Sequence, residues 1–232
     1  MELKIIALNA NGLRAGDKRK QFFDFIEGQR ADVVLVQETH ISNFTEWAGP
    51  QVHKFGSERS RGVAVLERNN LGKIISKGSL GEGRIAWIDF ELKGNVYRLT
   101  SVYAPNSPRD RVAFFQTDLV WAVSASHRNI IGGDFNCVED IGMDTRGIPV
   151  NSVTAFGGKE VVAALGAAGL VDAWRMINPT DFGHTWQNAS VSYRSRLNKI
   201  FLDNSLLVGC RHVFTKTKAS NPPWKLNVMA MK

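Results

Sequence analysis

The sequence has few cysteines and no long apolar run. Its 232 residues include only two cysteines, Cys137 and Cys210, which lie far apart and lack the paired spacing of a metal site. We therefore expect two reduced thiols and no disulfide framework. No apolar stretch reaches the length of a signal-peptide core or a membrane span, so we expect an intracellular protein that does not enter a membrane.

Internal repeats, low-complexity tracts and linkers rich in proline, glycine and serine are absent as well. The length suits one large α/β domain. A hydrophobic content of 44%, with 13 Phe and 6 Trp, supplies enough apolar surface for a sizeable core. We therefore predict a single domain over residues 1–232, and we exclude a disordered or fibrous chain.

Acidic residues are fewer than basic ones. The 22 Asp and Glu residues against 29 Lys and Arg give a formal net charge of +7 and a pI near 9.6. This excess favours a polyanionic partner if it gathers on one face. A basic enzyme without such a partner has the same composition, so charge alone leaves both interpretations open.

The sequence contains an alternation of strand and helix patterns. Apolar periodicity and turn residues predict strands at 3–8, 32–36, 63–67, 73–79, 85–92, 96–103, 129–132, 185–187, 194–202, 210–217 and 226–231. The four strands from 63 to 103 are typical of an antiparallel meander. Helices are expected at 17–29, capped by Asp17, and at 109–125 and 159–168. This mixture predicts an α/β (α+β) fold with two packed mixed sheets flanked by helices.

Four segments put a carboxylate or a carboxamide at the end of a predicted strand. They are Leu8-Asn9-Ala10-Asn11-Gly12, Val36-Gln37-Glu38-Thr39-His40, Val102-Tyr103-Ala104-Pro105-Asn106 and Gly132-Gly133-Asp134-Phe135-Asn136. A strand end is rigid and leads into a loop that ligands can reach. One such carboxylate is common by chance, but the joint pattern is far more specific. Together these oxygens can hold a divalent cation against a phosphate.

These segments, in this order, resemble the exonuclease–endonuclease–phosphatase superfamily, and within it the apurinic-endonuclease-like domains of LINE-type non-LTR retrotransposons. Further matches are Leu170-Val171-Asp172-Ala173-Trp174-Arg175 and Thr185-Trp186 followed by Ser195-Arg196-Leu197, so the resemblance extends over nearly the whole chain. It implies a four-layered α/β sandwich, dependence on Mg²⁺ with Mn²⁺ as an alternative, and cleavage of phosphodiesters.

The resemblance also implies a role for each matching residue. Glu38 would be the principal metal ligand, and His40 would orient it. The other implied roles are Asn9 beside the metal, Asp134 activating or orienting the attacking water, Asn136 positioning the phosphate, and Tyr103 and Asn106 donating to phosphate oxygens.

Three positions in two motifs depart from the family pattern. Asn198 stands where the family has Asp, and Asn221-Pro222 stands where it has Asp-His. The loss of a positioned acid or base costs about 10²–10⁴ in rate, so we expect feeble activity or none. A degenerate copy of the domain explains this better than replacement by His184 or His212; a deliberate or erroneous alteration of the sequence is the third explanation.

Basic and aromatic residues near the matching segments are expected to contact DNA. Arg14, Arg109 and Arg146 each follow a predicted active-site strand, as Arg111 does. Lys18 to Lys20 are expected on a solvated helix face instead. The remaining candidates, from the stretch 184–196, are Trp186, Tyr193, Arg194 and Arg196. For Trp186 and Tyr193, a place in the core is an equal alternative.

The leading hypothesis is a monomeric, nuclear endonuclease domain that nicks DNA for target-primed reverse transcription, with a reverse transcriptase domain in the parent polypeptide. A catalytically degenerate DNA-binding module on the same scaffold is the main alternative. A phosphatase of lipid or inositol phosphates and an abasic-site repair enzyme are favoured less, the latter because the altered final motif conflicts with essential chemistry.

Overall fold

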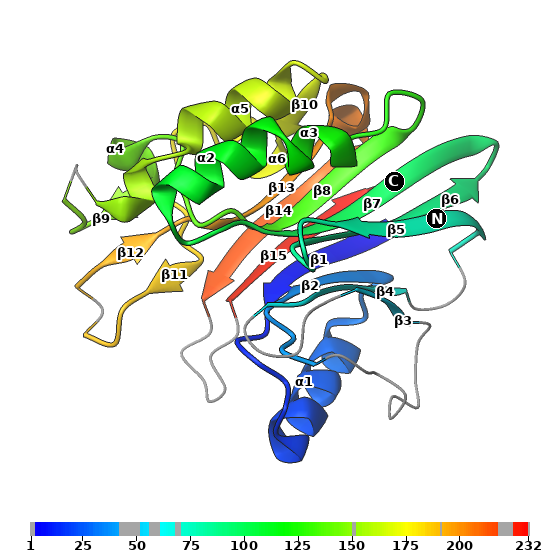
Figure 1. The fold of residues 1–232 in the computed structure, drawn as a ribbon, viewed down its shortest axis with the longest axis horizontal. Coiled ribbons are helices and arrows are strands. Elements are labelled where there is room, and N and C mark those ends of the chain that lie inside the picture. The colour runs from blue at the N-terminus through cyan, green and yellow to red at the C-terminus, as the bar shows by residue number, and fades with distance from the viewer. Residues whose placement is uncertain are drawn as a thin grey trace.

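Two six-stranded sheets pack face to face in the computed structural model, which describes residues 3–41, 52–55, 61–67, 71–149, 152–190, 192–217 and 225–231 (Figure 1). The first sheet has the order β14-β15-β1-β2-β4-β3, and the second has the order β10-β13-β8-β7-β6-β5. The first consists of β1 (Leu3–Asn9), β2 (Val33–Gln37), β3 (Val52–Phe55), β4 (Val63–Glu67), β14 (Cys210–Thr217) and β15 (Lys225–Met231). The second consists of β5 (Lys73–Leu80), β6 (Ile85–Leu92), β7 (Asn95–Tyr103), β8 (Arg128–Asp134), β10 (Leu170–Asp172) and β13 (Asn198–Asp203).

Helices cover the outer faces of both sheets. Helix α1 (Gly16–Gln29) lies against the first sheet, and α2 (Pro108–Gln116), α3 (Asp118–Ala122) and α5 (Gly158–Gly166) lie over the second (Figure 1). Shorter helical segments are α4 (Ile141–Asp144), α6 (Ala173–Ile177), η1 (Val153–Ala155) and η2 (Asn204–Gly209). The predicted four-layered α/β sandwich is therefore confirmed. No helix in the described part of the chain is long and apolar enough to cross a membrane.

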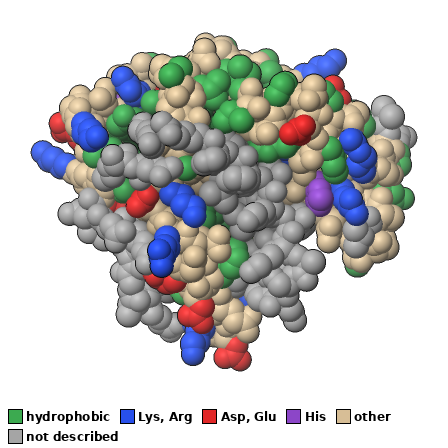
Figure 2. Space-filling model, turned by 180° about the vertical axis from the view of Figure 1, so that it is seen from behind, with side chains coloured by type: hydrophobic (Ala, Val, Ile, Leu, Met, Phe, Trp, Pro, Cys, Tyr) green, Lys and Arg blue, Asp and Glu red, His purple; other side chains and the backbone are tan. Residues whose placement is uncertain are grey.

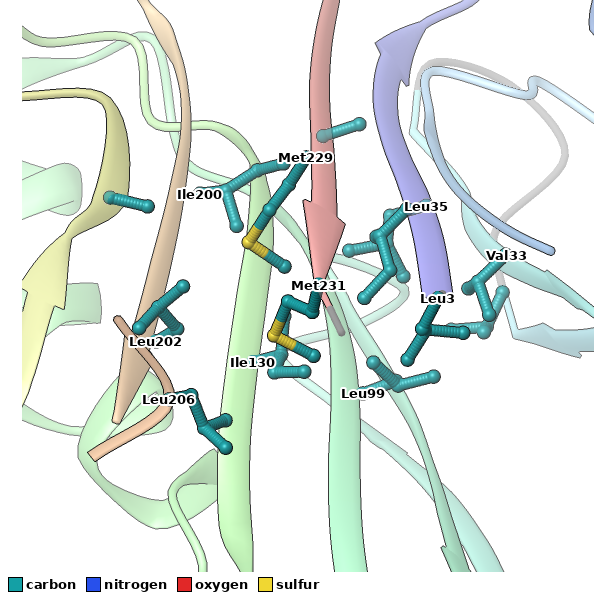
Figure 3. Close-up of a cluster of buried hydrophobic side chains, with 14 of the residues drawn as sticks. Leu3, Val33, Leu35, Leu99, Ile130, Ile200, Leu202, Leu206, Met229 and Met231 are labelled. Atoms are coloured by element: carbon teal, nitrogen blue, oxygen red, sulfur yellow. The ribbon is translucent and has the colours of Figure 1, made fainter. Parts of the chain in front are cut away.

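The main core lies between the two sheets. Leu3, Val33 and Leu35 of the first sheet face Leu99 and Ile130 of the second, and Met229 and Met231 fill the space between them (Figure 3). A second cluster lies under α1 around Phe22 and Ile26, and a third lies under α2, α3 and α5. Strands buried on both faces explain the continuous apolar runs in the sequence.

Two parallel strand pairs bring the polar strand ends together. Strand β1 runs parallel to β2, with Asn9 opposite Gln37, and β7 runs parallel to β8, with Tyr103 opposite Asp134. The carboxyl ends of parallel strands emerge at the same edge of a sheet. The loops that carry the four polar segments therefore begin at adjacent strand ends within each sheet.

A third, three-stranded sheet stands beside the main sandwich. It pairs β12 (Arg194–Ser195) with both β9 (Thr145–Arg146) and β11 (Trp186–Gln187). We call it the small sheet. Figure 1 shows it beyond the end of the second sheet, next to α4.

Several predictions of local structure were wrong in detail. The strand at 63–67 pairs with β2 in the first sheet, so only β5, β6 and β7 form the meander. The helix at 109–125 is interrupted at Thr117, whose φ of −120° and ψ of −85° are not helical. The strand at 194–202 is two strands, because β12 joins the small sheet and β13 joins β8. Ala15 rather than Asp17 occupies the N-cap of α1.

Candidate active site

Asn9 connects the ends of strands from both sheets. Its Nδ2 donates to Glu38 Oε1 at 2.7 Å and to Asp134 Oδ2 at 2.9 Å. Glu38 follows β2 of the first sheet, whereas Asp134 ends β8 of the second. One amide group therefore fixes the spacing of two carboxylates that are distant in the sequence.

The backbone around these carboxylates is strained. Seven described residues other than glycine have a positive φ, and four of them lie here: Asn11 (48°), Glu38 (52°), His40 (54°) and Asn136 (51°). Such conformations are unfavourable for residues with a Cβ and persist where the surroundings enforce them, often at functional sites. The turns after β1 and β2 enforce each other, since Gly12 N donates to Glu38 O at 2.7 Å and Leu13 N donates to Thr39 O at 2.9 Å.

Asp134 is fixed from its own loop as well. It is 7% exposed, and its Oδ1 accepts from the backbone N–H of Asn136 at 3.0 Å. The Asn136 side chain is anchored in turn, because its Nδ2 donates to Ala104 O at 2.8 Å. The loops after β7 and β8 therefore form one unit around the Asp134 carboxylate.

Tyr103 is a protonated donor beside the two carboxylates. Burial, followed by the charges of Glu38 and Asp134, raises the pKa of its phenol far above the usual range. Its hydroxyl hydrogen-bonds with Glu38 and with Asn106, and the Asn106 bond opposes part of this shift in pKa. The predicted residues Asn9, Glu38, Tyr103, Asn106, Asp134 and Asn136 are thus brought together.

Two basic side chains from the N-terminal region, His40 and Lys18, lie near Glu38. The Nε2 atom of His40 is 3.6 Å from Glu38 Oε2, and burial lowers the pKa of this imidazole against the attraction of Glu38. Lys18, on α1, donates from Nζ to Asn11 O, and burial lowers its pKa as well. The expected solvated helix face holds for Lys20, which is exposed, whereas Lys18 and Arg19 are half-buried. Lys18 lies in the first turn of α1, and no sequence pattern marks its contact with Asn11.

Asn198 lies directly opposite Asp134 in the pairing of β13 with β8 and is 1% exposed. Its backbone N–H donates to Thr185 Oγ1 at 2.9 Å, as does that of Leu197.

Asn221 and Pro222, the other altered positions, lie outside the described residues. His184 stacks on Phe182, with ring centroids 5.5 Å apart and an interplanar angle of 18°.

A pocket of about 440 Å³ opens over the carboxylates. Residues at strand ends of both sheets line it together with Trp186, Gln187, Asn188 and Ala189, which we call the pocket wall. The full lining is Asn9, Asn11, Glu38, Asp134, Asn136, Leu197 and this wall. Trp186 thus borders the pocket rather than the core. Gln187 had not been singled out from the sequence, because a glutamine beside a tryptophan has no distinctive pattern.

The predicted DNA contacts divide into accessible and buried residues. Arg14, Arg109 and Arg146 are exposed, Arg194 is half-buried, and Tyr193 is 43% exposed. Arg146 lies over the Phe182 ring at 4.0 Å from its centroid. On the face opposite to that of Figure 1, Lys and Arg side chains are scattered, with acidic side chains between them (Figure 2).

The assignment of Arg196 to DNA contact was wrong. Arg196 is 0% exposed and is paired with Asp144 and Asp172, so it has no surface to offer to a phosphate. Arg111 is also fully buried, and its guanidinium donates to backbone carbonyls that include those of Pro105 and Asn106. The sequence shows that an arginine is charged, but it does not show which acceptors the arginine pairs with inside the folded chain.

The donor atoms of the pocket suit a hard divalent cation. Glu38 and Asp134 supply carboxylate oxygens, and Asn9 and Asn136 supply amides. Mg²⁺ binds through one or two carboxylates, with water and phosphate completing its shell. Among the described residues no cluster of three or more His, Cys, Asp or Glu side chains could hold a metal, so a site made entirely of such residues is not found there.

Comparison with known proteins gives a consistent result. The endonuclease/exonuclease/phosphatase family matches residues 6–220. A transposon TX1 uncharacterized 149 kDa protein of Xenopus laevis is 29% identical in an alignment of 220 residues that covers 89% of this chain and 16% of that protein. An exodeoxyribonuclease of Bacillus subtilis is 26% identical over 84% of this chain and 83% of its own length.

A solved AP endonuclease of Archaeoglobus fulgidus has the same fold, with a TM-score of 0.82, 18% sequence identity and coverage of 99% of each chain. This likeness concerns the fold alone. The chain spans about a sixth of the transposon protein that it matches. The family match covers nearly the whole sequence and includes every strand end that contributes to the pocket. The chain therefore belongs to the endonuclease/exonuclease/phosphatase family.

Proposed function

We propose that this chain is a DNA endonuclease domain of a retroelement, which nicks one strand with the help of Mg²⁺ and is weakened by its altered final motifs. The observation that carries the proposal is the single amide of Asn9 bonded to Glu38 and Asp134 in one open pocket. The names of the relatives, a transposon protein and an exodeoxyribonuclease, support DNA as the substrate.

The residues of the pocket have complementary roles in this proposal. A bound Mg²⁺ would offset the charge that develops on the phosphorus and the leaving oxygen. Glu38, with Asn9 beside it, would hold the metal. Asp134 is fixed at both oxygens, so it would orient the attacking water and accept its proton. Tyr103 keeps its proton and would donate to a phosphate oxygen.

The altered positions explain why we expect weak turnover. Asn198 occupies a buried place opposite Asp134, where the resembling proteins have Asp. An amide supplies no negative charge to orient an imidazolium, and Pro222 supplies no imidazole. A missing acid or base of this kind lowers the rate by about 10²–10⁴.

A DNA-binding module without turnover is the second candidate. The same departures favour it, because Glu38 and Asp134 line the pocket while the final motif is changed. Under this alternative the chain binds DNA but does not cut it, even when residues 198, 221 and 222 are changed to those of the family pattern. We call that variant the repaired chain. The two candidates therefore differ in the behaviour of the repaired chain.

Nicking of supercoiled plasmid in the presence of Mg²⁺ tests the proposal. We expect Asn198→Asp, Asn221→Asp and Pro222→His together to raise the nicking rate by about 10²–10⁴. Glu38→Gln in the repaired chain is the matched control and should remove the gain. Equal rates for the original and repaired chains would refute the roles given to these three positions and favour the DNA-binding module.

The share of the transposon protein that this chain spans supports a longer parent polypeptide, in which we place a reverse transcriptase domain. A nick would then supply the 3′ hydroxyl from which reverse transcription starts. Such a substrate implies a nuclear site of action, and we propose that the domain acts as a monomer.

A further inference from the structure

Four charged side chains form a buried cluster beneath the small sheet. They are Asp144, Asp172, Arg175 and Arg196, here called the Arg196 cluster. Arg196 donates from Nε to Asp144 Oδ1 at 2.8 Å and from Nη1 to Asp172 Oδ2 at 2.5 Å. Arg175 donates from Nη2 to the same Asp144 oxygen at 2.5 Å. Glu139 and Lys199 adjoin the cluster, since Glu139 Oε1 lies 3.9 Å from Arg196 Nη2 and 3.6 Å from Lys199 Nζ.

Two strands of the small sheet adjoin this cluster directly, and the loop before the third contacts it. Strand β9 begins at the residue after Asp144, and β12 ends at the residue before Arg196. The backbone N–H of Arg196 also donates to Asp144 O at 3.0 Å. The loop that leads to β11 is held by Arg175, whose Nη1 donates to Asn178 O at 3.2 Å and to Asp181 O at 3.0 Å.

The small sheet in turn carries the pocket wall. Trp186 and Gln187 are β11 itself, and Asn188 and Ala189 follow it. On the other side, Arg196 is followed by Leu197, which lines the pocket, and by Asn198, which lies opposite Asp134. The cluster therefore connects the small sheet, which carries the wall, with the start of β13, which pairs with the strand of Asp134.

The arrangement depends on the shape of a guanidinium. Its planar fork bonds two carboxylates from different segments at once, whereas an ammonium is a point charge and does not reproduce that geometry. The Trp174 ring also packs against two guanidinium groups, at 5.1 Å from Arg196 and 4.7 Å from Arg175. Buried ion pairs contribute little net stability, and some are kept because they specify one conformation.

We propose that Arg196 is a positioning residue, which sets the place of the pocket wall relative to Asp134 and thereby the grip of the pocket on DNA. The inference about the wall stands on the contacts of the cluster. Its second half rests on the proposed function, since it takes DNA as the ligand. Arg196 itself touches no substrate, because it is buried under the small sheet.

Fluorine NMR of the full chain labelled with 5-fluorotryptophan tests the first half, with the Trp186 signal assigned from Trp186→Phe. We expect Arg196→Lys to shift or broaden the Trp186 signal. Arg98→Lys is the matched control, because Arg98 also forms a bidentate pair with a buried aspartate, Asp89, at 2.7 and 2.8 Å, but between β6 and β7. It should leave the Trp186 signal in place.

Fluorescence anisotropy with a labelled DNA duplex in Ca²⁺ tests the second half. We expect Arg196→Lys to weaken binding roughly tenfold and Arg98→Lys to leave it unchanged, since small misplacements of positioning groups have large effects. An unshifted Trp186 signal in Arg196→Lys, or the same change in Arg98→Lys, would overturn the proposal. If Arg196→Lys does not fold, Arg175→Lys replaces it, with the same expected and contrary results.

The two readouts separate the inference from the proposed function. If the original chain binds no DNA, the proposed function fails while the Trp186 signal still decides whether Arg196 positions the wall. If the chain binds DNA and Arg196→Lys moves the Trp186 signal without weakening binding, the wall does not govern the grip on DNA, and the second half of the inference is wrong.

Discussion

Asn198 and Asp134 are directly opposite each other in the antiparallel pairing of β13 with β8. One of these buried positions carries a charge and the other an amide. The pocket edge formed by the second sheet therefore has a single carboxylate where the family pattern has two. This difference accounts for the expected weakness of the chemistry, and it also affects stability.

Asn198→Asp alone should destabilise the chain at neutral pH. Opposite residues of paired strands lie within about 5.5 Å, and a second buried carboxylate at that distance raises the pKa of the added group. We expect the free energy of unfolding at pH 7 to fall by about 1–3 kcal/mol. The deficit should shrink below about pH 4, where the added group is protonated in both states. Urea unfolding at the two pH values checks this, and equal stability at pH 7 would contradict it.

Gly12→Ala should disturb the turn that carries the polar residues of β1. Gly12 has a φ of +82°, and an added Cβ would come within 2.8 Å of His40 Nδ1. We expect a loss of about 1–2 kcal/mol in the free energy of unfolding. Gly28→Ala is the control, because an added Cβ there meets nothing within 4 Å and lies in α1. It should stabilise the chain slightly, and equal effects of the two substitutions in urea unfolding would refute the prediction.

Asp144→Asn should make stability less dependent on pH in acid. Pairing with Arg196 outweighs burial and holds the pKa of Asp144 at about 2, below its usual 3.8. A depressed pKa means that this stabilisation, about 2 kcal/mol, is complete above pH 4 and is lost as the pH falls through about 2. Unfolding measured at pH 7 and pH 2 should show a large difference between the two chains only at pH 7.

The matched control for that experiment is Asp140→Asn. Asp140 caps α4 by accepting from Met143 N at 3.0 Å, and asparagine caps a helix about as well as aspartate. We expect its stability to stay close to that of the original chain at pH 7. A loss as large as that of Asp144→Asn would show that any aspartate in this segment matters equally.

Arg109 and Arg111 should behave in opposite ways although they are two residues apart. Arg109 is exposed, so Arg109→Ala should leave stability unchanged and reduce the salt dependence of DNA binding by about one phosphate contact. Arg111→Met removes a fully buried guanidinium that donates to the carbonyls of Val153 and Phe156 and should cost about 2–5 kcal/mol. Binding titrations at several salt concentrations and urea unfolding measure both effects.

The sequence predicts the layers of this fold well and the small sheet poorly. Continuous apolar runs such as 33–36 identify buried strands, because burial on both faces leaves no polar alternation. The two-residue strand β9 has no periodicity that a sequence pattern could reveal, and the pattern over 194–202 does not show that β12 and β13 belong to different sheets. Their positions depend on Arg196 and Asp144, which are distant in the sequence and meet only in the folded chain.

The polar strand ends were predictable, but their connections were not. Glu38 and Asp134 follow apolar runs, which marks both as carboxylates at rigid strand ends next to loops. The bond from Asn9 to both of them depends on how two sheets pack against each other. For the same reason the sequence did not distinguish the buried Arg196 from the exposed Arg146.

Binding of Mn²⁺ followed by the EPR signal of the free ion tests most directly whether Glu38, Asn9 and Asp134 form one cation site. We expect the chain to bind one Mn²⁺, Glu38→Gln to weaken this binding roughly tenfold or more, and Glu82→Gln, which alters an exposed glutamate paired with Arg61, to leave it unchanged. Equal binding by the original chain and Glu38→Gln would contradict the account.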